Sequence, residues 1–333
     1  MSRDMMSAFE LYQPDSVDGA VDLLSRFGAE GWALAGGNDS YDWFKDRVKR
    51  PKHVVDLSGI AELKGVRETA DGVEIGALTT LTEIERSGVI QNRYKVLADA
   101  ARRVASPQIR NSGTIGGNVC QDARCWYYRY GVDCYRAGGN QCYADSPAGQ
   151  NREHCLWGAD RCVAVSPSDT APALVALDAT MVIVGPGGQR EVKAEQFFIG
   201  PDVDIERMTV LEDGEVLTAI RLPAEWSGAR FYFEKVADRN TWDFPLVNIA
   251  AAMKVSGAAG SEKVDAIRIV AGAVQCVPRR LTVVEDVVRG QAKTPEMAAL
   301  AGQSAVRGAT PLLYNHFKIP LLQNLVTRAI RDA

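Results

Sequence analysis

The chain has 333 residues, of which 46% are hydrophobic and 24% are charged, and its formal net charge is −4. This composition is typical of a globular protein of about two domains and excludes collagen, a coiled coil and a disordered chain. Without a basic excess a nucleic-acid binder is disfavoured, and no apolar run approaches the ~20 residues of a membrane span.

The first third of the chain predicts short strands that alternate with helices. Residues 9–35 predict a strand, a helix and a strand, and Ser16 is placed to cap that helix, whose apolar residues recur at helical spacing. Further along, the pattern predicts a helix over 41–50, strands over 54–57 and 73–77, a helix capped by Thr82, and an Ala-rich helix over 97–104.

The middle of the chain predicts little regular structure. A glycine-rich stretch over 112–118 leads into about 40 residues rich in Gly, Asn and Asp without apolar periodicity. So long an irregular loop is unusual inside a compact domain and needs something other than an apolar core to hold it. Regular structure is expected to resume at 162–165, followed by a helix over 169–177 and a strand over 181–184.

The last third predicts a separate α+β unit. Pro223 together with Ser227 and Gly228 marks a plausible boundary. Beyond it the pattern predicts strands over 231–236, 247–255 and 267–273, and helices over 281–288, 295–305 and 321–330.

Two glycine pairs are candidates for binding an anion. The chain contains neither G-x-G-x-x-G nor G-x-x-x-x-G-K-[ST], which disfavours a dinucleotide fold of that type and a P-loop. Gly36-Gly37 and Gly116-Gly117 are each expected where a strand ends, followed by small polar residues. Glycine lets backbone amides point into one concavity, so two such loops could clasp a pyrophosphate. The alternative is that each pair only forms a tight turn.

The cysteines form a local cluster in the sequence. Six of the seven lie between positions 120 and 162. An odd number without a secretion signal disfavours a disulfide framework. A metal ion, an iron–sulfur cluster and a set of redox thiols remain as interpretations.

Several segments together resemble one family. LAGGND (34–39), IGALTT (75–80), SGTIGGN (112–118), SDTAPALVALD (168–178) and Lys235 with DFPLV (243–247) are similar, in order, to motifs of the FAD-binding medium subunits of molybdenum hydroxylases, the xanthine oxidase family. The resemblance implies an α+β fold with a PCMH-type FAD-binding part. Its two subdomains would span 1–55 and 56–224. A C-terminal α+β domain over 225–333 would resemble that of the CO dehydrogenase flavoprotein.

The resemblance also implies which residues contact FAD. They are Leu34, Ala35, Gly36, Gly37, Asn38, Asp39, Ser40, Ala77, Thr80, Gly113, Thr114, Gly116, Gly117, Asn118, Asp169 and Lys235. Asn38 stands where the family usually has Thr or Ser, but it can still form hydrogen bonds. For Asp169 the alternative is a helix cap shared with Ser168. The resemblance brings Lys235 near the isoalloxazine, and the alternative is that Lys235 is a surface lysine on a strand.

The cysteine insertion is similar to the subset of this family that carries an extra [4Fe-4S] cluster, as in the β subunit of 4-hydroxybenzoyl-CoA reductase and the FAD subunit of periplasmic aldehyde oxidoreductases. The matching ligands are Cys125, Cys134, Cys142 and Cys162. Their gaps of 9, 8 and 20 residues suit a loop around a cluster better than a zinc ribbon, and no C-x-x-C occurs. Zinc and a metal-free loop stay open, and Cys155 is the main rival ligand.

The resemblance implies an electron-transfer subunit, so we expect no catalytic residue in this chain. It would pass electrons between an external carrier, such as a ferredoxin, and two partners: a large molybdopterin-binding subunit and a small [2Fe-2S] subunit. The substrate, transformed on the large subunit, would be an aldehyde, an N-heterocycle or an aromatic acyl-CoA.

Two other functions stay open. A free-standing FAD-dependent oxidoreductase predicts activity of the isolated chain, whereas a zinc-stapled interaction subunit without catalytic function predicts a colourless protein. The first residues lack the charged segment and apolar core of a signal peptide. We therefore expect a cytoplasmic protein, or a periplasmic one if a partner with a signal exports it.

Overall fold

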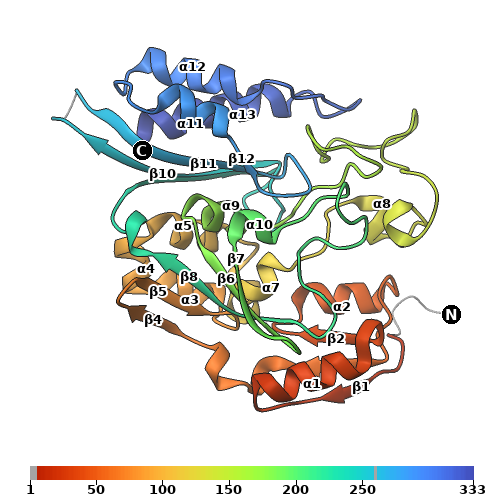
Figure 1. Ribbon diagram of the computed structural model, residues 1–333. Coiled ribbons are helices and arrows are strands. Elements are labelled where there is room, and N and C mark those ends of the chain that lie inside the picture. Colours follow the sequence, from red (N-terminus) through yellow and green to blue (C-terminus); the bar gives the residue numbers. More distant parts are fainter. Residues whose placement is uncertain (1–5, 259–260) are drawn as a thin grey trace.

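The computed structural model describes residues 6–258 and 261–333. Its strands form three sheets, with the orders β1-β3-β2, β4-β5-β8-β6-β7 and β12-β11-β10-β9. The first sheet is parallel and the other two are antiparallel. The fold is therefore α+β, as the sequence predicts, and the C-terminal sheet lies beside the two N-terminal units (Figure 1). No helix among the described residues has the length and apolar character that crossing a membrane requires.

The first unit is the small parallel sheet with two helices. Its elements are β1 (Glu10–Tyr12), α1 (Val17–Phe27), β2 (Gly31–Leu34), α2 (Asn38–Lys45) and β3 (His53–Asp56). Ser16 caps α1 as predicted, because its hydroxyl accepts a hydrogen bond from the backbone N–H of Gly19. The prediction for 41–50 has the right type but the wrong bounds. Gly37 adopts a φ of +75° and turns the chain directly from β2 into α2.

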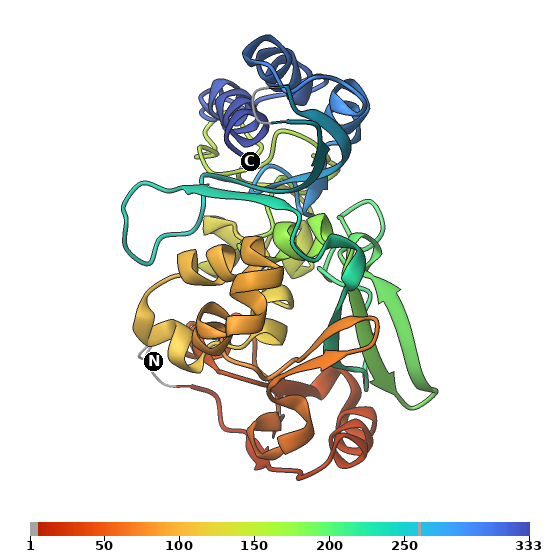
Figure 2. The same cartoon turned by 90° about the vertical axis from the view of Figure 1, so that its left-hand side faces the viewer.

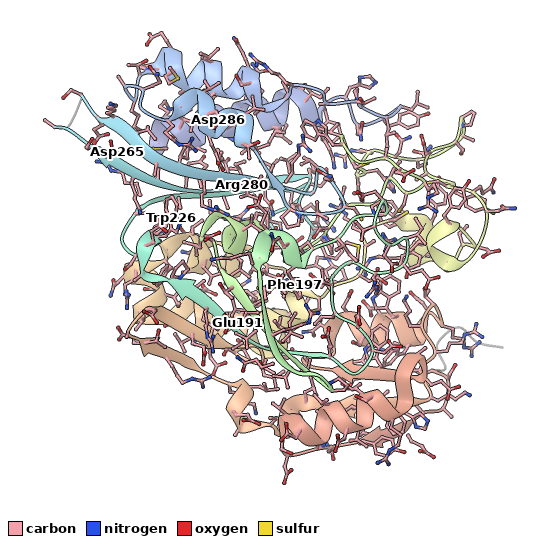
Figure 3. All side chains as sticks on the ribbon, viewed as in Figure 1. Glu191, Phe197, Trp226, Asp265, Arg280 and Asp286 are labelled. Atoms are coloured by element: carbon pink, nitrogen blue, oxygen red, sulfur yellow. The ribbon has the colours of Figure 1, made fainter. Side chains whose placement is uncertain are left out.

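The second unit is the five-stranded sheet with its packed helices. Its elements are β4 (Val66–Thr69), β5 (Gly72–Gly76), α3 (Leu81–Arg86), α4 (Gly88–Arg93), α5 (Lys95–Arg103), α6 (Pro107–Ser112), α7 (Ile115–Val119), α9 (Thr170–Ala176), β6 (Thr180–Gly185), β7 (Gly188–Lys193), α10 (Ala194–Phe197) and β8 (Val216–Pro223). Phe197, labelled in Figure 3, is fully buried in the core of this unit. The cap predicted at Thr82 is wrong. Thr80 caps α3 in a capping box. Its hydroxyl accepts a hydrogen bond from the backbone N–H of Glu83, and the Glu83 carboxylate accepts one from the backbone N–H of Thr80.

The second glycine pair does not follow a strand. Gly116 and Gly117 lie inside α7, which begins directly after Thr114. The Thr114 hydroxyl accepts a hydrogen bond from the Gly117 N–H over 3.1 Å. This N-cap starts a helical turn at the position where the glycines alone indicated a strand end.

The cysteine loop, residues 120–165, is irregular as predicted, apart from α8 (Trp126–Arg129) and a single 3₁₀ turn (Tyr135–Ala137). Residues 162–165 do not form the expected regular segment. Val163 to Val165 are buried, but only Val165 pairs with another strand-like residue, Arg124.

The C-terminal unit is a four-stranded sheet with three helices on one face. Its elements are β9 (Arg230–Val236), β10 (Val247–Ser256), β11 (Lys263–Gly272), β12 (Arg279–Arg280), α11 (Thr282–Val288), α12 (Pro295–Ala305) and α13 (Lys318–Asp332). All except the short β12, which the sequence did not predict, overlap a predicted range. Figure 2 shows the helices on the outer side of this sheet, and α5 and α9 contact its other side. Both faces are covered, so β10 is almost entirely buried from Val247 to Met253.

One short segment fastens the cysteine loop to this unit. The Asn315 side chain donates to the carbonyls of His154 and Cys155, and the fully buried Lys318 ammonium donates to those of Glu153, His154 and Ala273. Four contacts to carbonyls of the loop therefore hold its second half, and the contact of Lys318 with Ala273 ties it to the C-terminal unit.

Candidate functional site

The two glycine-rich segments meet face to face. A Cβ placed on Gly36 would lie 2.1 Å from the backbone oxygen of Ser112, so only glycine allows this approach. Asn38 bridges the same two segments: its amide donates to the carbonyl of Ile109 over 3.3 Å and to the hydroxyl of Ser112 over 3.1 Å. The side chain at the position that departs from the family pattern therefore helps to join the two segments.

A cavity of about 640 Å³ opens where these segments meet. That volume lies within the range of small-molecule and cofactor sites. The predicted residues that line it are Ala35, Gly36, Gly37, Asn38, Asp39, Ser40, Gly113, Thr114, Gly117, Asn118, Asp169 and Lys235.

The other predicted FAD residues lie behind this wall. Leu34 is buried in an apolar cluster, and Thr80 caps α3. The Gly116 N–H donates to the carbonyl of Ala77 over 2.8 Å, which places α7 against the end of β5. Leu34, Ala77, Thr80 and Gly116 therefore support the cavity without lining it.

The start of α2 offers uncapped amides to the cavity. Its N-cap is Gly37, and no side chain caps the helix. The first turn, Asn38 to Ser40, lines the cavity. Free N–H groups at a helix start attract anions, so this edge suits a phosphate-bearing ligand.

Asp169 and Lys235 form a buried ion pair at the cavity wall. The Lys235 ammonium donates to a carboxylate oxygen of Asp169 over 2.6 Å, and the Asn248 amide donates to the other oxygen over 2.8 Å. Asp169 is 2% exposed and Lys235 7% exposed, so Lys235 is not a surface lysine. Burial raises the pKa of Asp169, and Lys235 opposes that shift. Asp169 occupies the N-cap position of the following helix, but its side chain makes no capping hydrogen bond; the Ser168 hydroxyl accepts one from the N–H of Ala171.

The four predicted cluster ligands line one small cavity. Cys125, Cys134 and Cys162 are each 8% exposed, and Cys142 is partly buried. Tyr127, Tyr128, Tyr135 and Tyr143 complete much of the wall. The rival Cys155 is buried but does not line this cavity, and Cys120 lines the large cavity instead.

Cys125 is the one residue that lines both cavities. Burial raises the pKa of its thiol to about 12, and the His154 ring nitrogen Nε2 lies 3.3 Å from its sulfur. Burial also lowers the pKa of His154 to about 4, so a neutral imidazole faces this sulfur at neutral pH. Cys125 therefore belongs to the wall of both cavities.

The described residues contain no group of three or more His, Cys, Asp or Glu side chains placed to hold a single metal ion. The four thiols surround a shared space without converging on one point. Ligands of a multi-iron cluster each bind a different iron and so need not converge as the ligands of one ion do.

Several residues of the large cavity were not predicted as FAD contacts. They include Trp32, Arg124, Trp126, Arg129, Trp242 and Phe244. Trp126 and Arg129 belong to α8 on the cysteine loop, immediately after Cys125. The resemblance implied cluster ligands for the cysteine insertion, and we assigned no FAD contacts within it.

Comparisons with known proteins agree with this geometry. The family described as FAD binding domain in molybdopterin dehydrogenase matches residues 7–225, and the CO dehydrogenase flavoprotein C-terminal domain matches 232–333. The carbon monoxide dehydrogenase medium chain of Hydrogenophaga pseudoflava is 32% identical over 91% of this chain and 88% of its own. The aldehyde oxidoreductase FAD-binding subunit PaoB of Escherichia coli is 30% identical over 90% of both chains.

A solved structure extends the similarity to the fold. It is that of a carbon monoxide dehydrogenase from Hydrogenophaga pseudoflava that lacks the Mo-pyranopterin moiety of its molybdenum cofactor. It superimposes with a TM-score of 0.77 at 30% sequence identity and covers 99% of this chain and 98% of that one.

Proposed function

Because the chain belongs to the FAD-binding subunits of molybdopterin dehydrogenases, we propose that it is an electron-transfer subunit that holds a [4Fe-4S] cluster beside its FAD. As a member of this family it is an oxidoreductase subunit that binds FAD. The cluster, its ligands and the partners are the proposed part.

One observation carries the proposal: Cys125, Cys134, Cys142 and Cys162 line the same cavity, and Cys125 also lines the cavity between the glycine segments. These four would hold the cluster. The sixteen residues named above for FAD remain our proposed FAD site, with those of the cavity wall in contact and Leu34, Ala77, Thr80 and Gly116 in support. The domain boundaries at 55/56 and 224/225 are likewise part of the proposal.

When bound, FAD and an iron–sulfur cluster supply exchange between two-electron and one-electron chemistry. The chain's own residues provide placement and exclusion of water. Cys125 lines both sites. Tyr127 and Tyr143 stack with ring centroids 6.1 Å apart and cover the cysteine cavity. The buried wall limits solvent access, which is one of the factors that set a cluster's potential.

Partners follow from the relatives. The proposed assembly joins this chain to a molybdopterin-binding large subunit and a [2Fe-2S] small subunit, and the cluster gives a one-electron carrier such as a ferredoxin a point of contact. Among the substrates that the sequence implies, we propose an aldehyde. The similarity to PaoB and the long segment between Cys142 and Cys162 favour that branch. We place the complex in the cytoplasm unless a partner exports it.

Iron and flavin analysis of the purified complex tests the proposal. One FAD and four cluster irons are expected for this chain, in addition to the irons of the small subunit. Cys134→Ser should lose the four irons and Cys155→Ser should keep them. Iron lost from the Cys155 variant but kept in the Cys134 variant would overturn the ligand assignment. A complex with no iron beyond that of the small subunit would overturn the cluster, and turnover of small substrates by the isolated chain would favour the free-standing oxidoreductase.

A further inference from the structure

Arg136 is a buried cation in the wall of the cysteine cavity. It lies between Cys134 and Cys142 in the sequence, on the 3₁₀ turn Tyr135–Ala137. The residue is only 3% exposed and lines the cavity together with the four predicted ligands. A charge at such depth is stable only when it is paired and hydrogen-bonded.

The protein satisfies Arg136 only in part. One guanidinium nitrogen donates to the carbonyl of Glu206 over 2.8 Å, and another donates to the sulfur of Cys276 over 3.5 Å. The Nε of Arg136 is buried and has no hydrogen-bond partner among the residues that the structure describes.

The nearest carboxylate pairs with Arg136 without a direct hydrogen bond and is shared with two other groups. Asp122 lies 3.8 Å from the guanidinium, beyond hydrogen-bond distance. The same carboxylate accepts a hydrogen bond from Tyr128 over 2.8 Å and faces the ammonium of Lys49 at 3.4 Å. An arginine side chain keeps its proton in proteins, so the buried guanidinium is charged. Its neighbours include the sulfur of Cys276 and the more distant carboxylate of Asp122.

Resting on the proposed function, we propose that Arg136 is the positive charge that sets the reduction potential of the cluster held by Cys125, Cys134, Cys142 and Cys162. A cubane with four thiolates is anionic, and uptake of one electron from the flavin or the external carrier makes it more negative by one charge, with no bond made or broken. A buried guanidinium stabilises the more negative state most strongly, so Arg136 raises the potential.

Arg161 provides a matched control. It lines the same cavity and carries the same charge, but its side chain is 53% exposed and lies 4.0 Å from the carboxylate of Asp160. Solvent screens such a charge, so its removal should matter much less.

The test is an anaerobic potentiometric titration of the cluster in the intact complex, followed by electron paramagnetic resonance. In Arg136→Gln, the ratio of reduced to oxidised cluster at a fixed ambient potential should fall about tenfold, equivalent to about 59 mV for a one-electron couple. Arg161→Gln should change that ratio less than about twofold. Arg136→Lys, which keeps the charge, should stay close to the wild type.

Iron content separates the two proposals. If the wild-type chain holds no cluster, the proposed function fails. If all variants hold four irons and the potential of Arg136→Gln is unchanged, or Arg136→Lys shifts as far as Arg136→Gln, this inference fails. Should Arg136→Gln fold poorly, Arg136→Met removes the same charge without burying a new amide. Cluster loss in both neutral variants but not in Arg136→Lys supports the countercharge, and loss in all three contradicts it.

Discussion

Arg129 of the cysteine loop donates a hydrogen bond to the carboxylate of Asp39, in the first turn of α2, over 2.9 Å. The Arg129 guanidinium also lies over the ring of Trp43, 4.5 Å from its centroid, and donates to the carbonyls of Ala123 and Asp122. One side chain thus connects the glycine segment at the FAD cavity to the helix that follows Cys125. Arg129 therefore fastens the inserted loop to a wall of the cavity that we propose for FAD.

We predict that Arg129→Gln weakens FAD binding about fivefold. The Arg129–Asp39 ion pair is half-buried, so its loss should cost about 1 kcal/mol of the free energy of FAD binding. This value lies between those of an exposed ion pair and a buried hydrogen bond to a charged group. The measurement is the FAD dissociation constant of the variant by flavin fluorescence. Arg129→Gln combined with Asp39→Asn should weaken FAD binding by less than the sum of the two single losses, because each single change already removes the Arg129–Asp39 interaction.

Arg50→Gln is the control for this prediction. Arg50 is exposed, and its Nε donates only to the nearby carbonyl of Arg47. Its replacement should leave FAD affinity unchanged. Strictly additive losses in the Arg129 and Asp39 variants would show that the two side chains act independently.

Regular elements were predictable where apolar periodicity and a cap agreed. Ser16 and the apolar residues of α1 are one example, and β10 and α12 are others. The misses lie where one residue's conformation or one hydrogen bond decides. The positive φ of Gly37 moves the start of α2, the capping box selects Thr80 over Thr82, and the Thr114 cap makes a helix around Gly116. A local sequence pattern does not show whether the hydroxyl of Thr80 or that of Thr82 will accept the hydrogen bond from a free backbone N–H at the start of the helix.

The residues of the candidate site were likewise predictable where a local motif marks them and not where tertiary contacts decide. The motifs predicted residues of both glycine segments, which line the large cavity, and four cysteines, which line the small one. The sequence could not predict side-chain hydrogen bonds and ion pairs between residues that only the tertiary structure brings together. Asp169 was weighed as a helix cap but pairs with Lys235 from a strand 66 positions away. Arg136 has no motif of its own, and its partners Glu206 and Cys276 are 70 and 140 positions away.

Asp169→Asn should strongly destabilise the protein. It leaves the Lys235 ammonium buried, with the carbonyl of Arg103 and a neutral amide as its neighbours. Removing one partner of a buried ion pair costs about 3–5 kcal/mol. The thermal unfolding midpoint should fall by about 10 °C. The double variant Asp169→Asn/Lys235→Met should recover part of this loss, and a double variant as unstable as the single one would contradict the ion-pair explanation.

His154 should make stability depend on pH in mildly acidic solution. Burial lowers its folded pKa to about 4, whereas the ordinary value is 6.5. Between these values the unfolded chain binds more protons, so stability is full above about pH 6.5 and falls as the pH drops toward 4. The loss approaches about 1.4 kcal/mol per pH unit within that window. His154→Gln cannot take up this proton, so its thermal midpoint should drop less than that of the wild type between about pH 7 and about pH 5.

Gly36→Ala should separate the two glycine segments. Its Cβ would lie 2.1 Å from the backbone oxygen of Ser112, and a backbone atom cannot rotate away as a flexible side chain could. Either α2 or α6 must shift, which costs about 1–3 kcal/mol and widens the cavity that both segments line. FAD affinity should therefore fall about tenfold or more, measured by fluorescence, whereas Gly88→Ala should have no effect. Gly88 begins α4, and a Cβ there would meet nothing within 4 Å. Wild-type affinity in Gly36→Ala would mean that the cavity tolerates separation of its walls, and close contact between the segments would then not be what shapes the FAD site.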